Sequence, residues 1–330
     1  MRVVTLEEHF SLLLPGSHNT AAPSHAAGNV PDVVANAADK MTDIVGGRLA
    51  DMDRNGITVQ VLSKAGVHIT PSADQFEGKE AVEFAKKFND GFARKIAERP
   101  DRFAALTHLA ASVPEAAADE LERTVTEYGF KGTLISGTIR GAFLDDVKFA
   151  PLLARAEKLG VPIYIHPGIP PADVRKAYYE GFSKNINFGL ATFAWGWHYE
   201  VAVHVMRLAV SGTMDKYPKL NFIIGHMGEG LPAMLARCEH QFGKDLSFLS
   251  RPLSKTITDQ VYITSAGFFT NPPFVAALET FGIDRLMFSV DYPYASNADG
   301  RTFLDNVPLS AGDREKFAHG NADRLLKLSV

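Results

Sequence analysis

The chain has 330 residues, of which 46% are hydrophobic and 22% charged, enough to bury a sizeable core in one large α/β domain or two medium ones. A formal net charge of −4 argues against a nucleic acid or an acidic membrane as a partner attracted by charge. The single cysteine, Cys238, excludes an intrachain disulfide framework, fits a reducing cytoplasm and is best explained as a packing residue on a helix. We see no signal peptide, and no apolar run reaches the roughly 18–20 residues that span a bilayer. We therefore expect a soluble cytoplasmic protein.

The first predicted strand, which begins near residue 3, carries a Glu-x-His motif formed by Glu7 and His9. Because side chains alternate along a strand, Glu7 and His9 should share one face while Glu8 takes the other. A carboxylate and an imidazole side by side at a strand end make half of a divalent-metal site. A surface glutamate and a hydrogen-bonded histidine on an edge strand are the ordinary alternative, so the weight of this short motif depends on residues further along.

Residues 11–42 follow as a long, polar, irregular segment rich in Pro and Gly. Loops of this length are uncommon in compact domains and are usually either disordered or part of a binding site. Its position directly after the Glu-x-His motif favours the second interpretation, a lid over a pocket. The sequence does not choose among His18, His25 and His68, three loop histidines that such a lid could bring to the pocket.

Regular alternation of strands and helices begins after residue 42. Predicted helices cover residues 48–55, 79–98, 114–128, 150–159, 199–211, 229–242 and 273–281, and helical tail segments lie near 312–317 and 321–328. Residues 168–198 read as a second long connection. Predicted strands begin near residues 3, 58, 103, 130, 161, 220, 260 and 285.

These eight strands are apolar almost throughout, as expected for parallel strands covered on both faces. Eight β/α units in about 250–330 residues predict a (β/α)8 barrel, here a single domain over residues 1–330 with a helical tail. A doubly wound open sheet is the competing fold. It is disfavoured because the first strand is followed by Glu-x-His and not by a Gly-rich phosphate loop.

Polar groups gather at the predicted carboxyl ends of the strands, the face on which barrel active sites lie. They are Glu7, His9, His166, His226 with Glu229, and Asp291. A mixed nitrogen and oxygen set such as Glu7, His9, His166 and Asp291 suits Zn²⁺ or Mn²⁺, with positions left open for substrate. We expect one metal ion and not two, because no lysine stands at a strand end with the neighbours of a bridging, carboxylated lysine.

The order of these motifs resembles the amidohydrolase superfamily. The motifs are Glu-x-His on the first strand, His166-Pro167 after the fifth, Gly225-His226-Met227-Gly228-Glu229 after the sixth and Ser289-Val290-Asp291-Tyr292-Pro293 after the eighth. The chain is similar, more narrowly, to the metal-dependent non-oxidative decarboxylases, which include 2,3-dihydroxybenzoate, γ-resorcylate, 5-carboxyvanillate and aminocarboxymuconate-semialdehyde decarboxylases. Many superfamily members open with His-x-His, and the Glu7 form resembles the hydroxybenzoate decarboxylases.

The resemblance implies that Glu7, His9, His166 and Asp291 bind the metal and that His226 and Glu229 form a hydrogen-bonded pair beside it. It also implies that Arg237, eight residues past Glu229, reaches the substrate or a subunit boundary, although a surface salt bridge explains this arginine equally well. Trp197 and His198 are candidates for lining the pocket, with an aromatic packing cluster as the alternative. The resemblance implies a homodimer or homotetramer.

The activity that the resemblance implies is decarboxylation of a hydroxybenzoate-like aromatic acid or a related unsaturated carboxylic acid, with Asp291 as the proton donor to the ring. A metallohydrolase is the alternative, in which a metal-bound water cleaves an amide, a lactone or a C–C bond and Asp291 acts as base. A barrel that holds a structural metal or only binds a ligand is disfavoured, because structural zinc sites are usually closed by four Cys and His ligands.

Overall fold

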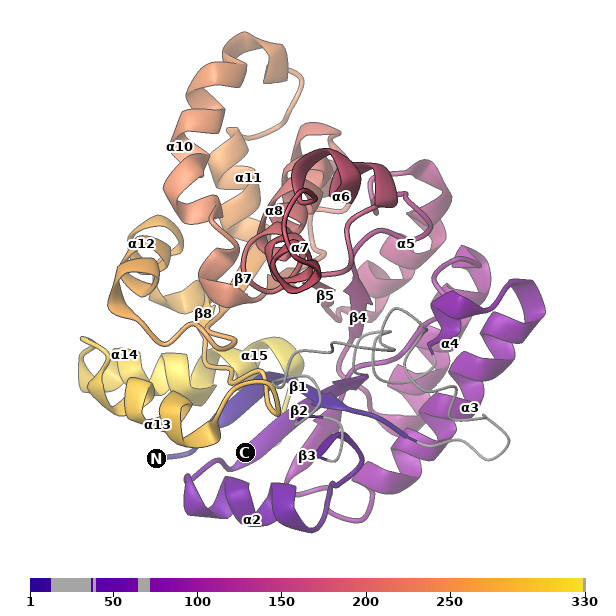
Figure 1. Cartoon of the computed structure of the whole chain (residues 1–330), viewed down its shortest axis with the longest axis vertical. Helices are drawn as coiled ribbons and strands as arrows, with labels where there is room; N and C mark the ends of the chain where they lie inside the picture. Colours follow the sequence, from indigo (N-terminus) through magenta and orange to yellow (C-terminus); the bar gives the residue numbers. More distant parts are fainter. Residues whose placement is uncertain (13–36, 38–39, 65–71, 329–330) are drawn as a thin grey trace.

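The computed structural model describes residues 1–12, 37, 40–64 and 72–328. Its strands lie at the centre with helices arranged around them (Figure 1). All eight predicted strands are present: β1 (Val4–Phe10), β2 (Val59–Lys64), β3 (Phe103–Ala105), β4 (Thr133–Ser136), β5 (Ile163–His166), β6 (Phe222–Ile224), β7 (Val261–Thr264) and β8 (Leu286–Met287).

The strands form two parallel ladders that together close into the predicted (β/α)8 barrel. One ladder runs β1-β2-β3 and the other β4-β5-β6-β7-β8. At the first seam, the backbone N–H of Thr107 donates to Gly132 over 2.8 Å, and Thr107 bridges Thr133 in parallel. At the second seam, the N–H of His9 donates to the carbonyl of Tyr292 over 2.7 Å. Hydrogen bonds at or just beyond the ends of the strands therefore bridge both seams between the two sheets.

The covering helices lie where the sequence predicts them. They are α2 (Gly47–Arg54), α3 (Gly78–Ile96), α4 (Pro114–Tyr128), α5 (Ala150–Leu159), α8 (Gly196–Val210), α10 (Leu231–Phe242) and α12 (Asn271–Phe281). In α3 the periodic residues Ala81, Ala85, Phe88 and Phe92 are all buried, which is why its 3.6-residue pattern was readable. None of the helices in the described part of the chain combines the length and apolarity that a bilayer span requires.

The core has two apolar layers, one inside the barrel and one between the strands and the helices. In β5, Ile163 and Ile165 belong to the outer layer, whereas Tyr164 belongs to the inner one. His166 shares the inward parity of Tyr164 because strand side chains alternate. Strands buried on both faces explain the continuous apolar runs in the sequence.

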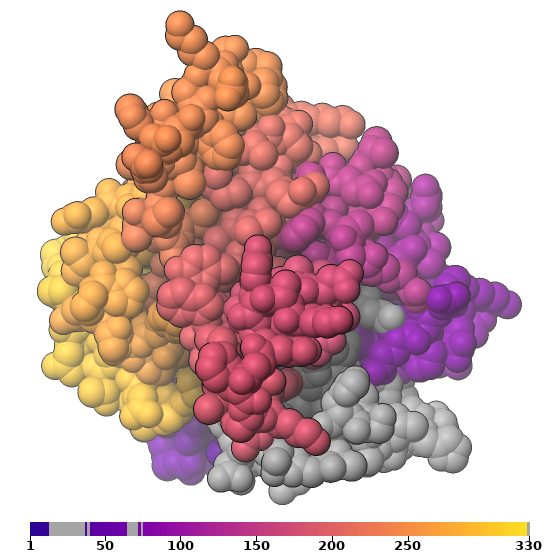
Figure 2. Space-filling view, turned by 45° about the horizontal axis from the view of Figure 1, so that its top comes forward, coloured from indigo at the N-terminus to yellow at the C-terminus, as the bar shows by residue number. Residues whose placement is uncertain are grey.

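The predicted long connection at residues 168–198 contains two helices that the sequence did not indicate. These are α6 (Ala172–Tyr178) and α7 (Lys184–Ala191), and Figure 2 shows this segment (rose) standing forward at the centre of one face. Several of its large apolar side chains are exposed, and they are scattered over the two helices and the loops around them, so they produce no periodic signal. They include Tyr178, Phe182, Ile186 and Trp195.

The structure also contains helices that the sequence did not indicate, namely α9 (Thr213–Lys216), α11 (Leu253–Gln260) and α13 (Asn297–Asn306). The predicted helical tail is present as α14 (Ala311–Glu315) and α15 (Asn321–Leu326), joined by a π-helical turn over Lys316–Gly320. Most of the expected lid at residues 11–42, with His18 and His25, lies outside the described residues, as does His68.

Candidate active site

Strand β1 delivers two of the candidate site residues through a local irregularity. Its ladder with β2 shifts register between Thr5 and Glu8, and Glu7 has a φ of 63°. Left-handed backbone at a residue other than glycine costs roughly 1–3 kcal/mol and is often found at functional sites. Glu7 and His9 turn toward the end of the barrel, whereas the Glu8 side chain points to the segment after β8, as alternation predicts.

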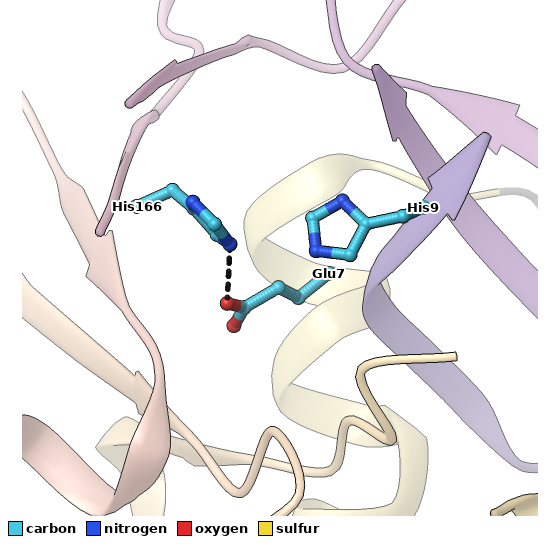
Figure 3. A group of neighbouring side chains, drawn as sticks. All are labelled: Glu7, His9 and His166. Carbon is cyan, nitrogen blue, oxygen red and sulfur yellow. Dashed lines mark ion pairs between the residues drawn. The ribbon is translucent and has the colours of Figure 1, made fainter. Parts of the chain in front are cut away.

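Glu7, His9 and His166 come together in one buried cluster, and Asp291 lies beside it. Figure 3 shows the carboxylate of Glu7 and the two imidazoles facing a common centre. Glu7 Oε1 lies 3.2 Å from His166 Nε2, and His9 Nε2 lies 3.1 Å from Asp291 Oδ1. Ligating atoms of the first three residues all lie within 4.8 Å of one another. Residues far apart in the sequence thus converge as predicted.

Neighbouring polar groups fix the orientation of these side chains. His166 Nδ1 donates to the Pro167 carbonyl oxygen over 2.7 Å, which points Nε2 toward Glu7. The hydroxyl of Tyr164 donates to Glu7 Oε2 and lies 2.8 Å from the Thr264 hydroxyl. Sequence reasoning missed Tyr164, although its place two residues before His166 in the same strand gave a signal.

Gly225, directly before His226, leaves room for the Glu7 carboxylate. A Cβ atom built on Gly225 would lie 2.4 Å from Glu7 Oε2 and 3.1 Å from Oε1, closer than atoms in contact can approach. The glycine of the Gly-His-Met-Gly-Glu motif is therefore required by the position of a carboxylate that comes from the first strand.

The donor atoms of the cluster fit a divalent cation. Glu7 Oε1, His9 Nε2 and Asp291 Oδ1 are buried and have no hydrogen-bond partner among the described residues, whereas most buried polar atoms in proteins are paired. These three atoms and the nearby Nε2 of His166 make a set of two nitrogens and two oxygens. This set suits Mn²⁺ or Zn²⁺ and leaves coordination positions open.

Electrostatics in the cluster keep at least one imidazole neutral, as a metal ligand must be. Burial, and then the positive charge of His166, lower the pKa of His9 to about 3. Desolvation, and then the negative charge of Glu7, raise the pKa of Asp291 to about 8. Burial also acts to raise the pKa of Glu7, but His226, His166 and His9 outweigh it and lower the pKa overall.

A second group, His198, His226 and Glu229, adjoins the first. Glu229 Oε1 lies 2.7 Å from His226 Nδ1, and Oε2 lies 2.6 Å from His198 Nδ1. Burial acts to lower the pKa of His226, but the carboxylates of Glu229 and Glu7 raise it to about 10. His226 Nε2 lies 3.9 Å from Glu7 Oε1, so this hydrogen-bonded triad adjoins the metal cluster through the His226 ring.

Comparison with known proteins places the chain in a family. The family model described as Amidohydrolase matches residues 9–328. The chain belongs to the amidohydrolase family. A γ-resorcylate decarboxylase from Polaromonas sp. is 34% identical to this amidohydrolase over 338 residues, covering 99% of this chain and 98% of the relative.

Solved structures of decarboxylases share the fold of this amidohydrolase. A 2,6-dihydroxybenzoate decarboxylase in complex with 2,6-dihydroxybenzoate has a TM-score of 0.86 and 32% identity, covering 99% of each chain. A dihydroxybenzoic acid decarboxylase from Polaromonas sp., with bound manganese and the inhibitor 2-nitroresorcinol, has a TM-score of 0.87 and 31% identity, covering 99% of this chain and 97% of the other. These similarities confirm the resemblance seen in the motifs.

The remaining candidate residues of the amidohydrolase lie at different distances from the cluster. His198 pairs with Glu229, and its ring packs edge-on against Phe268 with centroids 5.1 Å apart, a role that depends on three-dimensional proximity and left no trace in the sequence. Trp197 is half-buried and packs edge-on against Phe193 with centroids 6.3 Å apart. Neither contact tests the expected substrate-binding roles, which stay predictions.

Arg237 is exposed on α10, and no described residue forms a hydrogen bond or an ion pair with it. A surface salt bridge within the described chain therefore does not account for this arginine. Its predicted place at the substrate or at a subunit boundary stays a prediction.

Proposed function

We propose that this amidohydrolase is a metal-dependent, non-oxidative decarboxylase of a hydroxybenzoate-like aromatic acid. The observation that carries the proposal is the convergence beside His166 of buried ligand atoms from Glu7, His9 and Asp291 that have no hydrogen-bond partner in the described part of the chain. Supporting it, the γ-resorcylate and dihydroxybenzoate decarboxylases match this chain over nearly its whole length.

Glu7, His9, His166 and Asp291 would hold one divalent ion. Mn²⁺ is the first choice because a similar decarboxylase contains manganese, and Zn²⁺ suits the same ligands. The bound ion would act as a Lewis acid toward the carboxylate and ortho-oxygen of the substrate and so stabilise negative charge that develops on those oxygens.

Asp291 would protonate the ring. The Asp291 side chain is 18% exposed, whereas the side chains of Glu7 and His9 are 0% and 1% exposed, so among these three it is the one open to a substrate. Its carboxyl proton forms a new C–H bond at the ring carbon that bears the substrate carboxylate. The C–C bond to that carboxylate then breaks, its electron pair restores the aromatic ring, CO2 leaves, and Asp291 takes up a proton from water.

The His198–Glu229–His226 triad would orient the substrate or relay the proton. Glu229 accepts hydrogen bonds from both imidazoles, which fixes the ring of His226 and leaves its Nε2 facing Glu7 and the cluster. A positively charged Nε2–H there is a donor for a substrate oxygen.

The first experiment measures CO2 release by Mn²⁺-loaded protein from 2,6- and 2,3-dihydroxybenzoate and 5-carboxyvanillate in D2O. We expect release from at least one acid, with one deuterium in the product at the carbon that lost the carboxylate. Asp291→Asn should lower kcat at least about 100-fold because the donated proton is removed. The matched control is Asp299→Asn, at an exposed position on α13, which should retain wild-type activity.

Two results would contradict the proposal. Cleavage of amide or lactone substrates without CO2 release from any of the acids would identify a metallohydrolase. Undiminished decarboxylation by Asp291→Asn would remove Asp291 from the role of proton donor.

A further inference from the structure

We infer that Glu8 is a positioning residue, which holds Asp291 at the metal cluster by fastening the backbone on both sides of it; this rests on the proposed role of Asp291. Glu8 stands between Glu7 and His9 in the sequence, but its side chain takes the opposite direction and does not join the donor atoms of the cluster.

The contacts of Glu8 are directed at the two neighbours of Asp291. Its side chain is fully buried. Glu8 Oε1 accepts a hydrogen bond from the backbone N–H of Val290 over 2.9 Å, and Oε2 accepts one from the N–H of Tyr292 over 3.0 Å. The N–H of His9 donates to the carbonyl oxygen of Tyr292 over 2.7 Å. Two consecutive residues of β1 thus make three hydrogen bonds to residues 290–292.

The segment that carries Asp291 needs such support because the sheet does not supply it. Strand β8 pairs with β7 only through Leu286 and Met287, and no strand ladder joins β8 to β1 among the described residues. Asp291 itself has a φ of 69°, in the left-handed region that residues other than glycine rarely adopt. An isolated segment with this backbone would relax, and the carboxylate would leave the cluster.

Other contacts also hold this segment, at Ser289 and at the carbonyl of Asp291, but the N–H groups of Val290 and Tyr292 are bound by Glu8. On one side, the Ser265 hydroxyl donates to the Ser289 carbonyl over 2.7 Å and accepts from the Ser289 N–H over 2.9 Å. On the other side, the Asp291 carbonyl accepts hydrogen bonds from the N–H groups of Tyr294 and Ala295 over 2.8 and 3.0 Å.

Buried Arg48 supports the strand from which Glu8 projects. Its Nη2 donates to the His9 carbonyl over 2.5 Å, and its Nη1 donates to Gln60 Oε1 over 3.1 Å. Its guanidinium also stacks on the Tyr292 ring, 4.6 Å from the centroid. Arg48 therefore touches both the strand and the segment that Glu8 joins.

The two hydrogen bonds that Glu8 accepts from Val290 and Tyr292, which we call the Glu8 clamp, require a carboxylate. Two N–H donors need two acceptor oxygens, and a glutamine at this position has one oxygen and one NH2 group, which would face an N–H donor. Glu8→Gln keeps the size of the side chain but breaks one of the two hydrogen bonds, whereas Glu8→Asp keeps both oxygens on a shorter side chain.

The test measures Mn²⁺ affinity by titration calorimetry, the EPR spectrum of the bound Mn²⁺, kcat and the melting temperature. We expect Glu8→Gln to weaken Mn²⁺ binding roughly 10- to 100-fold, the range for residues that orient metal ligands, to change the EPR spectrum and to lower kcat more than it changes KM. Glu8→Asp should show a smaller change of the same kind. Either variant suffices if the other fails to fold.

A double variant separates positioning from general stability. If Glu8 acts through Asp291, the pair Glu8→Gln/Asp291→Asn should bind Mn²⁺ no more weakly than Asp291→Asn alone. The matched control is Glu120→Gln, which alters a buried, hydrogen-bonded glutamate on α4 away from the cluster and should lower the melting temperature without changing Mn²⁺ affinity.

Additive losses in the double variant, or unchanged Mn²⁺ affinity in a folded Glu8 variant, would overturn the inference. The affinity and EPR measurements do not depend on turnover. If the wild-type protein binds Mn²⁺ but decarboxylates none of the tested acids, the proposed function is wrong. The Mn²⁺ titrations of the Glu8 variants would still decide whether Glu8 positions Asp291.

Discussion

The adjacent residues Glu7 and Glu8 have different roles because their side chains point in different directions. Both are fully buried. Glu7 faces imidazoles, whose positive charges lower its pKa despite burial. Glu8 faces two peptide N–H groups and accepts a hydrogen bond from each of them. The alternation of a strand therefore gives one glutamate to the metal cluster and its neighbour to the backbone.

At the scale of a single residue, His204 on α8 predicts a pH dependence of stability. It is buried, and its Nε2 accepts a hydrogen bond from the N–H of Leu144 over 3.0 Å. Burial lowers its pKa to about 4, with Asp145 opposing and Arg207 adding to the shift. Because the folded-state pKa lies below the unfolded value near 6.5, the stabilisation is complete above pH 6.5 and is lost as the pH falls toward 4.

Urea unfolding at pH 7 and pH 5 measures this effect. The wild-type protein should lose about 2 kcal/mol of unfolding free energy through His204 between these pH values. His204→Gln, which keeps an acceptor for Leu144, should lose correspondingly less. His240→Gln, at an exposed position, serves as the control and should follow the wild-type curve. Equal pH dependence in all three proteins would show that His204 titrates normally.

At the scale of an element, the sequence predicts strands and covering helices well because each leaves a local pattern. The apolar run at residues 161–166 predicted β5, and the spacing of Phe88 and Phe92 predicted α3. Helix α6 left no such pattern because its apolar side chains are exposed, and α7 is only eight residues long with Ile186 exposed and Phe188 and Leu190 half-buried. The link between His198 and Glu229 joins two elements, and no local pattern could have predicted it.

The turn after β6 predicts that Gly225 is needed to leave space for the Glu7 carboxylate of β1. In Gly225→Ala the new methyl group would collide with the Glu7 carboxylate, 2.4 Å away, so Glu7 must move out of the cluster. We expect Mn²⁺ affinity to fall at least about 10-fold with retention of the barrel. Calorimetric titration with Mn²⁺ measures the loss, and circular dichroism checks the fold.

The control for this turn is Gly230→Ala, where no atom of the described residues lies within 4 Å of the added Cβ. Its φ of 79° adds backbone strain that Gly225, with a φ of −85°, does not have, so this control is the more demanding substitution for the backbone. It should bind Mn²⁺ like the wild-type protein. Equal affinity in Gly225→Ala would mean that the Glu7 carboxylate can shift without cost to the site.

At the scale of the whole molecule, the donor cluster joins both sheets of the barrel. Glu7 and His9 come from the sheet β1-β2-β3, whereas His166 comes from the sheet β4-β5-β6-β7-β8 and Asp291 follows that sheet's last strand. A cation that binds these residues would link the sheets where their backbone hydrogen bonds are sparse. Metal binding should therefore stabilise the entire fold.

Removal of the metal tests whether metal binding stabilises the entire fold. With Mn²⁺ at 100 times its dissociation constant, binding contributes about 2.7 kcal/mol, which corresponds to roughly 4 °C in melting temperature for a chain of this size. EDTA should abolish that increment in the wild-type protein and have no effect on His166→Ala. If EDTA leaves the melting temperature of the Mn²⁺-loaded wild-type protein unchanged, metal binding does not stabilise the fold.

The clamp made by Glu8 also bears on how the protein is made in the cell. Its two hydrogen bonds join residues that are 282 and 284 positions apart in the chain. At about 5–20 residues per second, a ribosome needs roughly 15–60 s to add Val290 and Tyr292 after Glu8. Throughout that interval Glu8 lacks the two N–H groups that it binds in the folded protein. The metal cluster can be completed only after Asp291 has been added, so a nascent chain should acquire its ion only after that point.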